Sequence, residues 1–456
     1  MYIKNSSELV ENGKTKAERS ARRFCLEAVE SALQAVEPGA LVRAKVKLSE
    51  DRRYLVVGRR RVALSKFRRI VVIGGGKAAS GMASSIEEIL GDKITEGMVN
   101  VPESEAGRPR RSRIERHGAT HPLPSLEGEE GVRRMFKLVG DLREDTLVIC
   151  LISGGGSAML PMPTEGITLP DKVETTRSLL KAGADIKELN IVRKHLSELK
   201  GGWMAVRLYP ATVLSLVISD VVGNRLDSIA SGPLYPDVST FNDAAGVLRK
   251  YKLLGKVPTG VLRLIERGQA GRIPDTPKPG SKYFEKVTNV IIGSNADASE
   301  AAVRRLRAMH CRPTLLKTSY EGESREVGMR LGSVTSHAAG PRPRSWVAGG
   351  ETTVNVRGGG VGGRNLELAL AASMKISGNL GVAAVSIGTD GVDGPTDAAG
   401  AIVDGDTIDR ARALGLDPRK HLQRNDSYPF FKELGDLIMT GPTGTNVNDL
   451  CVITAC

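Results

Sequence analysis

Glycine-rich turns after apolar strands are the features of this sequence best suited to chemistry. The first, Gly74-Gly75-Gly76-Lys77, lies between the apolar run 70–73 and a predicted helix over 78–90. Glycines let a backbone approach a phosphate closely, and the N-terminus of the following helix supplies N–H donors. The ammonium of Lys77 adds a charge that can follow a transferring phosphoryl group. This turn predicts a phosphate site with Lys77 as a catalytic cation.

The same turn has two other interpretations. Gly74-x-Gly76-x-x-Ala79 fits the loose fingerprint of dinucleotide-binding loops, which requires an acidic residue at the end of the next strand. Glu103 is the nearest candidate for that residue, and the Walker A pattern is absent from the sequence. The structural alternative is a tight strand-to-helix turn with an exposed lysine.

A second turn places two hydroxyls around three glycines, after the apolar strand predicted over 146–152. Successive backbone N–H groups in such a turn form a concavity that binds anions, and packing alone rarely requires three consecutive glycines. We therefore expect phosphate or nucleotide contacts from Ser153, Gly154, Gly155, Gly156 and Ser157.

Carboxylates follow two further predicted strands. Asp220 follows the strand predicted over 212–218, and Asn224, four residues later, is a candidate substrate contact. Asp390 lies in the glycine turn that follows the strand predicted over 382–387. An aspartate at a strand end is a candidate Mg²⁺ ligand or a base that acts on a hydroxyl. An Asx-turn or a helix cap is the alternative for Asp220. Both Asp220 and Asp390 are candidate metal ligands.

A glycine-rich loop over 358–363 leads into a predicted helix over 364–377. Arg364, at the start of this helix, can pair bidentately with a carboxylate or a phosphate. Glu351 and Asn365 are candidates to complete this part of the site. The alternative is a flexible hinge without ligand contact. A separate helix over 185–199 carries basic residues that either line an anionic pocket or face water: Arg193, Lys194 and, just after it, Lys200.

Alternation of apolar strands with helices predicts two α/β units. The first begins with a helix over 15–38 and a hairpin at 54–57 and 61–64, and continues with parallel strands. Residues 251–287 are rich in proline, glycine and charge, which indicates a linker that contains one helix at 259–267. The rhythm then restarts at 288 and includes a strand predicted over 352–356. A ligand cleft between two such units is the default expectation.

Composition narrows the classes of function. The 456 residues include 65 lysine and arginine against 52 aspartate and glutamate, a net charge of +13, with denser basic clusters at 59–69 and 108–116. No nucleic-acid motif accompanies the charge, which favours a solvated surface or a field that attracts small anions. The polar N-terminus and the lack of long apolar runs predict a cytoplasmic protein with neither a membrane nor a nucleic-acid partner. Five cysteines without a CxxC pair indicate neither a disulfide framework nor a zinc site.

Taken in order, these motifs resemble those of the class II glycerate kinases, whose C-terminal domain is called MOFRL. The resemblance runs from about residue 20 to the C-terminus. Ten stretches carry it: VVIGGGKAASGMA (71–83), THPLPS (120–125), LISGGGSAML (151–160), LNIVRKHLSELKGG (189–202), SDVVGN (219–224), SGPLYPD (231–237), GGETTV (349–354), GGRNLELAL (362–370), GTDGVDGPTDAAGA (388–401) and GPTGTNVNDL (441–450).

The resemblance implies an N-terminal Rossmann-like three-layer α/β/α domain over 1–250, the linker over 251–287, and a smaller C-terminal MOFRL-type α/β domain over 288–456, with the active site in the cleft. It implies that ATP phosphorylates D-glycerate to 2-phosphoglycerate with Mg²⁺ or another divalent cation, in a monomer or homodimer. Lys77 and Arg364 match the family's active-site lysine and arginine. Some members carry the name hydroxypyruvate reductase, so an NAD(P)H-dependent hydroxypyruvate reductase is the alternative function.

Overall fold

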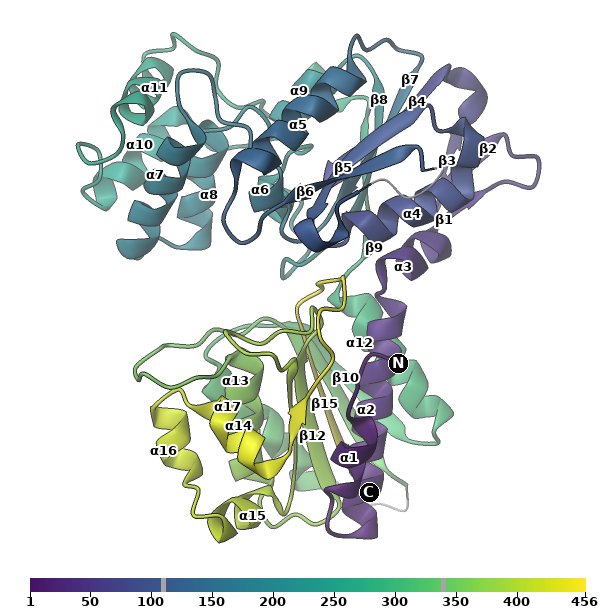
Figure 1. The fold of residues 1–456 in the computed structure, drawn as a ribbon, viewed down its shortest axis with the longest axis vertical. Coiled ribbons are helices and arrows are strands. Elements are labelled where there is room, and N and C mark those ends of the chain that lie inside the picture. The colour runs from purple at the N-terminus through teal and green to yellow at the C-terminus, as the bar shows by residue number, and fades with distance from the viewer. Residues whose placement is uncertain (108–111, 338–341) are drawn as a thin grey trace. The chain divides into compact units, whose positions relative to one another are not determined.

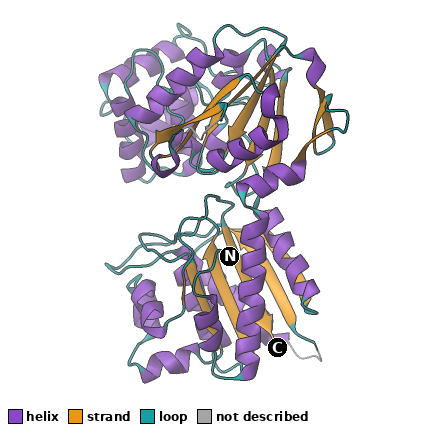
Figure 2. Cartoon of the chain, turned by 45° about the vertical axis from the view of Figure 1, so that its right-hand side comes forward, coloured by secondary structure: helices purple, strands orange, loops and turns teal. Residues whose placement is uncertain are grey.

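The computed structural model describes residues 1–107, 112–337 and 342–456, and it divides into two compact units. Unit 1 combines Met1–Ala40 with Gly293–Cys456, and unit 2 is Leu41–Ile292. In both units helices flank a central sheet (Figures 1 and 2). Arg108, Arg110 and Arg111 of the second basic cluster lie outside the described residues.

The central sheet of unit 2 has the order β6-β5-β4-β7-β8-β9. Neighbouring strands from β6 to β8 are parallel, so their carboxyl ends meet at one edge. The central strands β4, β7 and β8 are almost continuous apolar runs, as expected for a sheet covered on both faces. The bounds of the strands in this sheet are β4 (Arg69–Gly75), β5 (Glu96–Pro102), β6 (Ile114–Ala119), β7 (Thr146–Ile152), β8 (Thr212–Ile218) and β9 (Val287–Gly293).

Helices cover both faces of this sheet, which makes unit 2 a three-layer α/β/α domain. Helices α5 (Leu126–Val139) and α9 (Trp203–Leu208) share a core with β4 and β7, and α4 (Ala79–Leu90) also packs on the sheet. A small antiparallel sheet of β1 (Val46–Leu48), β2 (Tyr54–Val57) and β3 (Arg60–Ala63) precedes them and contains the predicted hairpin. Short helices connect the elements: α3 (Pro38–Lys45), η1 (Leu64–Lys66), η2 (Gly91–Lys93), η3 (Glu103–Glu105), η4 (Ile229–Ser231) and η5 (Lys282–Phe284).

A group of helices beside the sheet has its own apolar core (Figure 1). Its members are α7 (Leu169–Lys181), α8 (Ile186–His195), α10 (Phe241–Lys250) and α11 (Thr259–Gln269). Capping boxes begin three of them, because the side chains of Thr168, Asp185 and Thr240 each accept from the backbone N–H three residues on. Helix α11 confirms the helix predicted within 251–287.

The sheet of unit 1 is mixed and has the order β10-β11-β15-β12-β13-β14. Strand β10 is parallel to β11, while β15 runs antiparallel to both of its neighbours. The bounds are β10 (Arg312–Tyr320), β11 (Arg344–Gly350), β12 (Val382–Gly388), β13 (Gly400–Asp404), β14 (Leu437–Ile438) and β15 (Asp449–Ala455). The antiparallel register brings the first residue of β15 opposite the last residues of β11 and β12.

Helices α2 (Lys16–Ala35) and α12 (Asn295–Ala308) pack together on one face of this sheet, and α13 (Ser324–Gly332) packs with α14 (Arg364–Ile376) elsewhere on it (Figure 1). The α2 helix confirms the helix predicted over 15–38. Its amphipathic pattern buries Cys25, Leu26 and Val29. The remaining helices are α1 (Ser6–Glu11), η6 (Ser333–His337), α15 (Thr407–Ala413), α16 (Pro418–Gln423) and α17 (Ser427–Leu434).

A buried ion network fixes α2 to the C-terminal half of the chain. The Nε of Arg22 donates to Asp404 at 2.6 Å, and its Nη1 donates to Asp436 at 2.9 Å. All three side chains are inaccessible to solvent, and Arg410 also binds Asp436 at 2.5 Å. This network is one reason why residues 1–40 belong to unit 1.

The two units divide the chain differently from the sequence-based boundaries of 1–250, 251–287 and 288–456. Residues 1–40 join the C-terminal unit, and 251–287 lie within unit 2, where α11 packs on α10 and α7. The strand predicted over 352–356 is wrong, since only Thr353 makes a bridge there. Within the described parts of the chain, no helix is both long enough and apolar enough to cross a membrane.

Candidate active site

The strand order of unit 2 creates a topological switch point between β4 and β7. From β4 the chain moves to β5 on one side, and it returns to β7 on the other. Ligands of open α/β sheets bind outside the carboxyl ends of the strands at such a point. The two loops that flank it here are Gly74–Lys77 and Ser153–Ser157, the first two glycine turns singled out in the sequence.

Hydrogen bonds lock these two loops together. The N–H of Lys77 donates to the carbonyl of Gly154 at 2.8 Å, and the N–H of Ala78 donates to Ser153 Oγ at 3.0 Å. The N–H of Gly76 donates to the carbonyl of Asn100. A Cβ on Gly76 would lie 2.3 Å from Ser153 Oγ, so glycine at this position lets the loops approach each other.

The second loop, rather than the first, offers backbone N–H groups that can donate to an anion. The N–H groups at 76–78 are all engaged within the protein. Gly154 and Gly155, by contrast, donate none of the hydrogen bonds found among the described residues. This arrangement also disfavours a dinucleotide at 74–79, because that mode needs free N–H groups at the start of the following helix.

Three polar side chains gather around the second loop. A Cβ built on Gly155 would lie 3.2 Å from Lys77 Cγ and 3.2 Å from the ring of His121. A Cβ on Gly154 would lie 2.5 Å from Asp220 Oδ2. The lysine and the aspartate are each half-buried. The structure thus brings Lys77, Asp220 and the glycine loop of 153–157 together at the switch point.

Asn224 lies farther along the β8 loop, in the left-handed conformation with φ of 55°. It is exposed and lines a pocket of about 410 Å³ together with Arg225, Asp227 and Tyr235. It belongs to unit 2, like the loops of the switch point.

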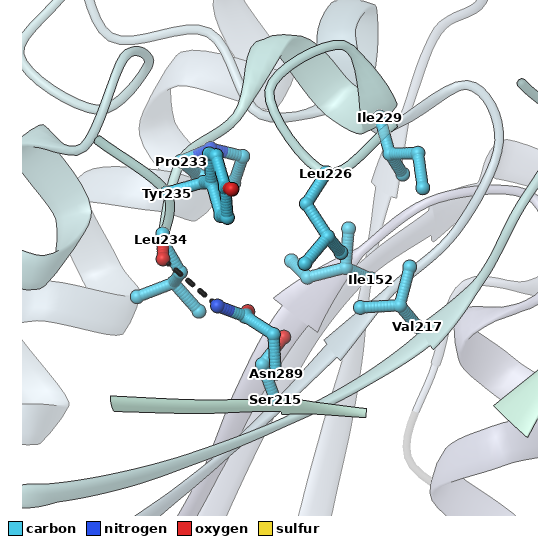
Figure 3. A pocket seen from close by; sticks show the side chains of 9 residues that line it. All are labelled: Ile152, Ser215, Val217, Leu226, Ile229, Pro233, Leu234, Tyr235 and Asn289. Carbon is cyan, nitrogen blue, oxygen red and sulfur yellow. Dashed lines mark hydrogen bonds between the residues drawn. The ribbon is translucent and has the colours of Figure 1, made fainter. Parts of the chain in front are cut away.

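Beneath this loop lies a much smaller cavity of about 10 Å³ (Figure 3). Apolar side chains such as Ile152, Val217 and Leu226 line it, and Asn289 donates to the carbonyl of Leu234 at 3.0 Å. Ser215 Oγ also lines it and has no hydrogen-bond partner within the described part of the chain. The volume suits one water molecule, so this cavity is not the substrate site.

Arg193 and Lys200, two of the basic residues noted in the sequence, lie beside the second loop. Arg193 Nη2 donates to Ser157 Oγ at 2.5 Å, and Lys200 Nζ donates to the carbonyl of Ser157 at 2.7 Å. Lys172, on α7, lies in the same group. Sequence reasoning missed it because a lysine in an amphipathic helix is normally solvated. We call Lys172, Arg193 and Lys200 the cationic cluster.

Unit 1 gathers the other candidate residues at one edge of its sheet. Asp449, the first residue of β15, lies in register with Gly350 and Gly388, the last residues of β11 and β12. Glu351 follows β11 directly, and Asp390 lies two residues beyond the end of β12. The sequence analysis did not identify Asp449, because its motif, 441–450, contains no pattern of charged residues. The antiparallel register of β15 is what brings it to this edge.

Arg364 binds two carboxylates at this edge. Its Nε and Nη2 donate to the two oxygens of Asp449 at 2.7 and 2.9 Å, and its Nη1 donates to Glu351 at 2.9 Å. Burial opposes the charged form, but Asp449 and Glu351 outweigh it and raise the pKa of Arg364. Three of five N–H donors are used in these contacts, which leaves two for an anion.

Asn365 and Asp393 hold the start of α14 in place. Asp393 accepts from the backbone N–H of Asn365 at 3.0 Å and from that of Leu366 at 2.8 Å. The Asn365 amide donates to Asp449 Oδ1 at 3.1 Å and accepts from Ser386 at 2.7 Å. Asn365 therefore orients Asp449, which in turn orients Arg364.

The titration of Asp393 gives a testable pH dependence. Burial raises the pKa of its carboxyl to about 6, against about 3.9 in an unfolded chain. The folded state therefore binds the proton more tightly, and this group lowers the free energy of unfolding as pH rises from about 4 to about 6. A difference of two units between the folded and unfolded pKa corresponds to about 3 kcal/mol in the free energy of unfolding. We expect Asp393→Asn, which mimics the protonated form, to remove this contribution in urea unfolding at pH 4 to 7. Parallel pH profiles of the two proteins would contradict it.

Metal binding by protein side chains alone has no support in the described residues, among which no three His, Cys, Asp or Glu side chains group as a metal site. Asp220 and Asp390 lie in different units. Mg²⁺ in nucleotide enzymes is commonly held by one or two carboxylates plus substrate phosphates and water. The lone carboxylate of Asp220, beside the Gly154 backbone, fits that mode.

Two family models match the chain. Residues 24–266 match the model described as "Domain of unknown function (DUF4147)", and residues 344–449 match that of the MOFRL family. The first match spans the switch point and the cationic cluster, and the second contains Arg364 and Asp449.

Relatives of known name cover most of the chain. The D-glycerate 2-kinase of Thermotoga maritima is 43% identical over 344 residues, 74% of this chain and 79% of that protein. A crystal structure of glycerate kinase from the same organism matches with a TM-score of 0.83 and 39% identity, covering 96% of this chain and 100% of that one. A protein of Agrobacterium vitis, provisionally named hydroxypyruvate reductase, is 39% identical over 75% of this chain and 77% of its own length.

Proposed function

Because the chain belongs to the class II glycerate kinase family, we propose that it phosphorylates D-glycerate at the 2-hydroxyl with ATP, giving 2-phosphoglycerate and ADP. The observation that carries the proposal is the pair of locked loops at the switch point, with Lys77 and Asp220 beside Gly154 and Gly155. Phosphoryl transfer needs positioning and charge neutralisation more than covalent help from the protein. These loops offer both.

Each residue at the switch point has an assigned role. Amides of the loop 153–157 hold nucleotide phosphates, while 74–76 form the rigid floor beneath them. The ammonium of Lys77 offsets the charge that builds on the transferring phosphoryl group. Asp220 accepts the proton of the glycerate 2-hydroxyl. The oxygen of that hydroxyl forms a bond to the γ-phosphorus, and the bond from this phosphorus to the ADP oxygen breaks.

A divalent metal ion and Arg364 have the remaining roles in the proposed reaction. Mg²⁺, when bound with the nucleotide, would neutralise phosphate charge, and Asp220 of unit 2 is the carboxylate proposed to hold it. Asp390, in unit 1, stays a separate candidate ligand. Arg364, held by Asp449 and Glu351, directs its two remaining N–H donors to a substrate anion. The proposal places the protein in the cytoplasm, where ATP and small hydroxy acids are available, as a monomer or homodimer.

Two assays test the class of reaction. We expect ADP release from ATP and Mg²⁺ only after D-glycerate is added, with L-glycerate as the control substrate. We expect no oxidation of NADH or NADPH in the presence of hydroxypyruvate. Nicotinamide oxidation without ADP release would replace the kinase by the reductase.

A further inference from the structure

The cationic cluster contains more positive charge than the fold balances. Lys172 and Lys200 are buried, and Arg193 is partly so. Lys172 Nζ has no hydrogen-bond partner within the described part of the chain. An unpaired buried ammonium is costly, because it has lost its water and gained no anion in exchange. The fold therefore holds a cation here at a cost to its own stability.

A neighbouring lysine shows how this fold neutralises a structural cation. Lys194, next to Arg193 on α8, is also buried, and its Nζ donates to Asp237 at 3.1 Å. Asp237 in turn accepts from Ser239 and Thr276. Within the described part of the chain, Lys172 Nζ has no such partner. The carboxylate of Glu129 on α5 acts on its charge, but that carboxylate already accepts from Arg133 at 2.6 Å.

Mutual repulsion marks the three cations as one group. Burial, with the nearby charge of Arg193, lowers the pKa of Lys172 to about 7. Burial, followed by the charges of Lys172 and Arg193, lowers the pKa of Lys200. Arg193 and Lys200 both donate to Ser157, whose hydroxyl also meets Ser231 at 2.9 Å. Arg193 and Lys200 thus contact the end of the 153–157 loop, and Lys172 lies close enough to both for their charges to interact.

We infer that Lys172, Arg193 and Lys200 form a binding site for a phosphate dianion beside Ser157. Arg193 at the hydroxyl of Ser157, Lys200 at its carbonyl and the unpaired Lys172 near both exceed what a single carboxylate would balance. A phosphate group carries about two negative charges and accepts several hydrogen bonds. The dianion belongs either to the nucleotide or to the phosphorylated product. This inference rests on the proposed function, since it assigns charge at the same loop.

The test uses sulfate, a dianion that does not itself titrate near neutral pH. Calorimetry in buffers of different ionisation enthalpy counts the protons that accompany binding to the intact protein. We expect wild-type protein to take up protons with sulfate, since the dianion raises the pKa of Lys172 and charges it. Affinity should fall as pH rises from about 6 to about 9, where the empty site loses that proton.

Lys172→Met separates a binding role from a structural one. We expect this variant to unfold at a higher temperature than wild type without ligand, because it removes a buried unpaired cation. It should bind sulfate at least tenfold more weakly and without proton uptake. Lys181→Met, at an exposed position of the same helix, is the matched control and should change neither property.

Titration with MgADP and with 2-phosphoglycerate then identifies the source of the dianion. The ligand whose affinity falls at least tenfold in Lys172→Met, but not in Lys181→Met, is the one whose phosphate occupies the site. Absence of sulfate binding to wild type would overturn the inference. So would affinities in Lys172→Met that equal those of wild type for every ligand. Sulfate binding that depends on Lys172 in a protein inactive on glycerate would leave the site intact and reject the proposed function instead.

Discussion

Lys77→Ala is expected to lower kcat for phosphoryl transfer to D-glycerate by about 10²–10³-fold. The side chain lies against Gly155 at the switch point, between the two locked loops. A positioned cation in a water-poor site stabilises the charge of the transition state more than the same cation would in water, and removal of one such group typically costs this much. Initial rates of ADP release at saturating ATP and glycerate measure the loss.

The control for this prediction is Lys66→Ala, an exposed lysine of the same unit. It should keep wild-type turnover. The backbone bond from the N–H of Lys77 to Gly154 is kept in the alanine variant, so both variants should remain folded. Near wild-type turnover in a folded Lys77→Ala protein would remove Lys77 from the mechanism.

Arg22→Met is expected to lower the free energy of unfolding of unit 1 by about 3–5 kcal/mol, the usual result of removing one partner from a buried ion pair. The guanidinium binds Asp404, Asp436 and the carbonyl of Leu9. Without it two buried carboxylates lose their shared cation, and among the described residues Arg410 is the ion-pair partner left to both. The loss should detach α2 from the sheet before the rest of the unit unfolds.

Fluorescence can follow unit 1 alone. Of the two tryptophans, Trp346 lies on β11 in unit 1 and Trp203 on α9 in unit 2. In a Trp203→Phe background, urea unfolding monitored through Trp346 reports the stability of unit 1. Arg23→Met changes an exposed neighbour on the same helix and should leave the midpoint unchanged. Equal midpoints for Arg22→Met and Arg23→Met would show that the buried network contributes nothing.

Local patterns in the sequence were sufficient for much of unit 2. The glycine turns at 74–76 and 153–157 follow apolar strands, and parallel strands end at the same edge, so their meeting was predictable. The directions in which the backbone N–H groups of these two turns point were not predictable. Gly76 is a glycine because Ser153 lies against it, and this contact between distant residues leaves no trace in either motif.

Tertiary contacts explain what the sequence did not predict. The pattern of residues 16–35 predicts a helix, but not that it belongs to unit 1, which depends on its packing against α12 and β12 and on the pairing of Arg22 with Asp404 and Asp436. Strand β13 was missed because its glycine and alanine resemble a turn. Lys172 has the sequence signature of a surface lysine. Burial close to Arg193 of α8 is what makes it chemically distinct.

The most direct test of the central claim is the identity of the product. Purified protein incubated with D-glycerate, ATP and Mg²⁺ should give a new phosphomonoester signal in ³¹P NMR that coincides with added 2-phosphoglycerate, as the γ-phosphate signal of ATP declines. A signal that coincides with 3-phosphoglycerate would contradict transfer to the 2-hydroxyl. An unchanged spectrum, from protein whose unfolding transition shows it to be folded, would contradict the kinase itself.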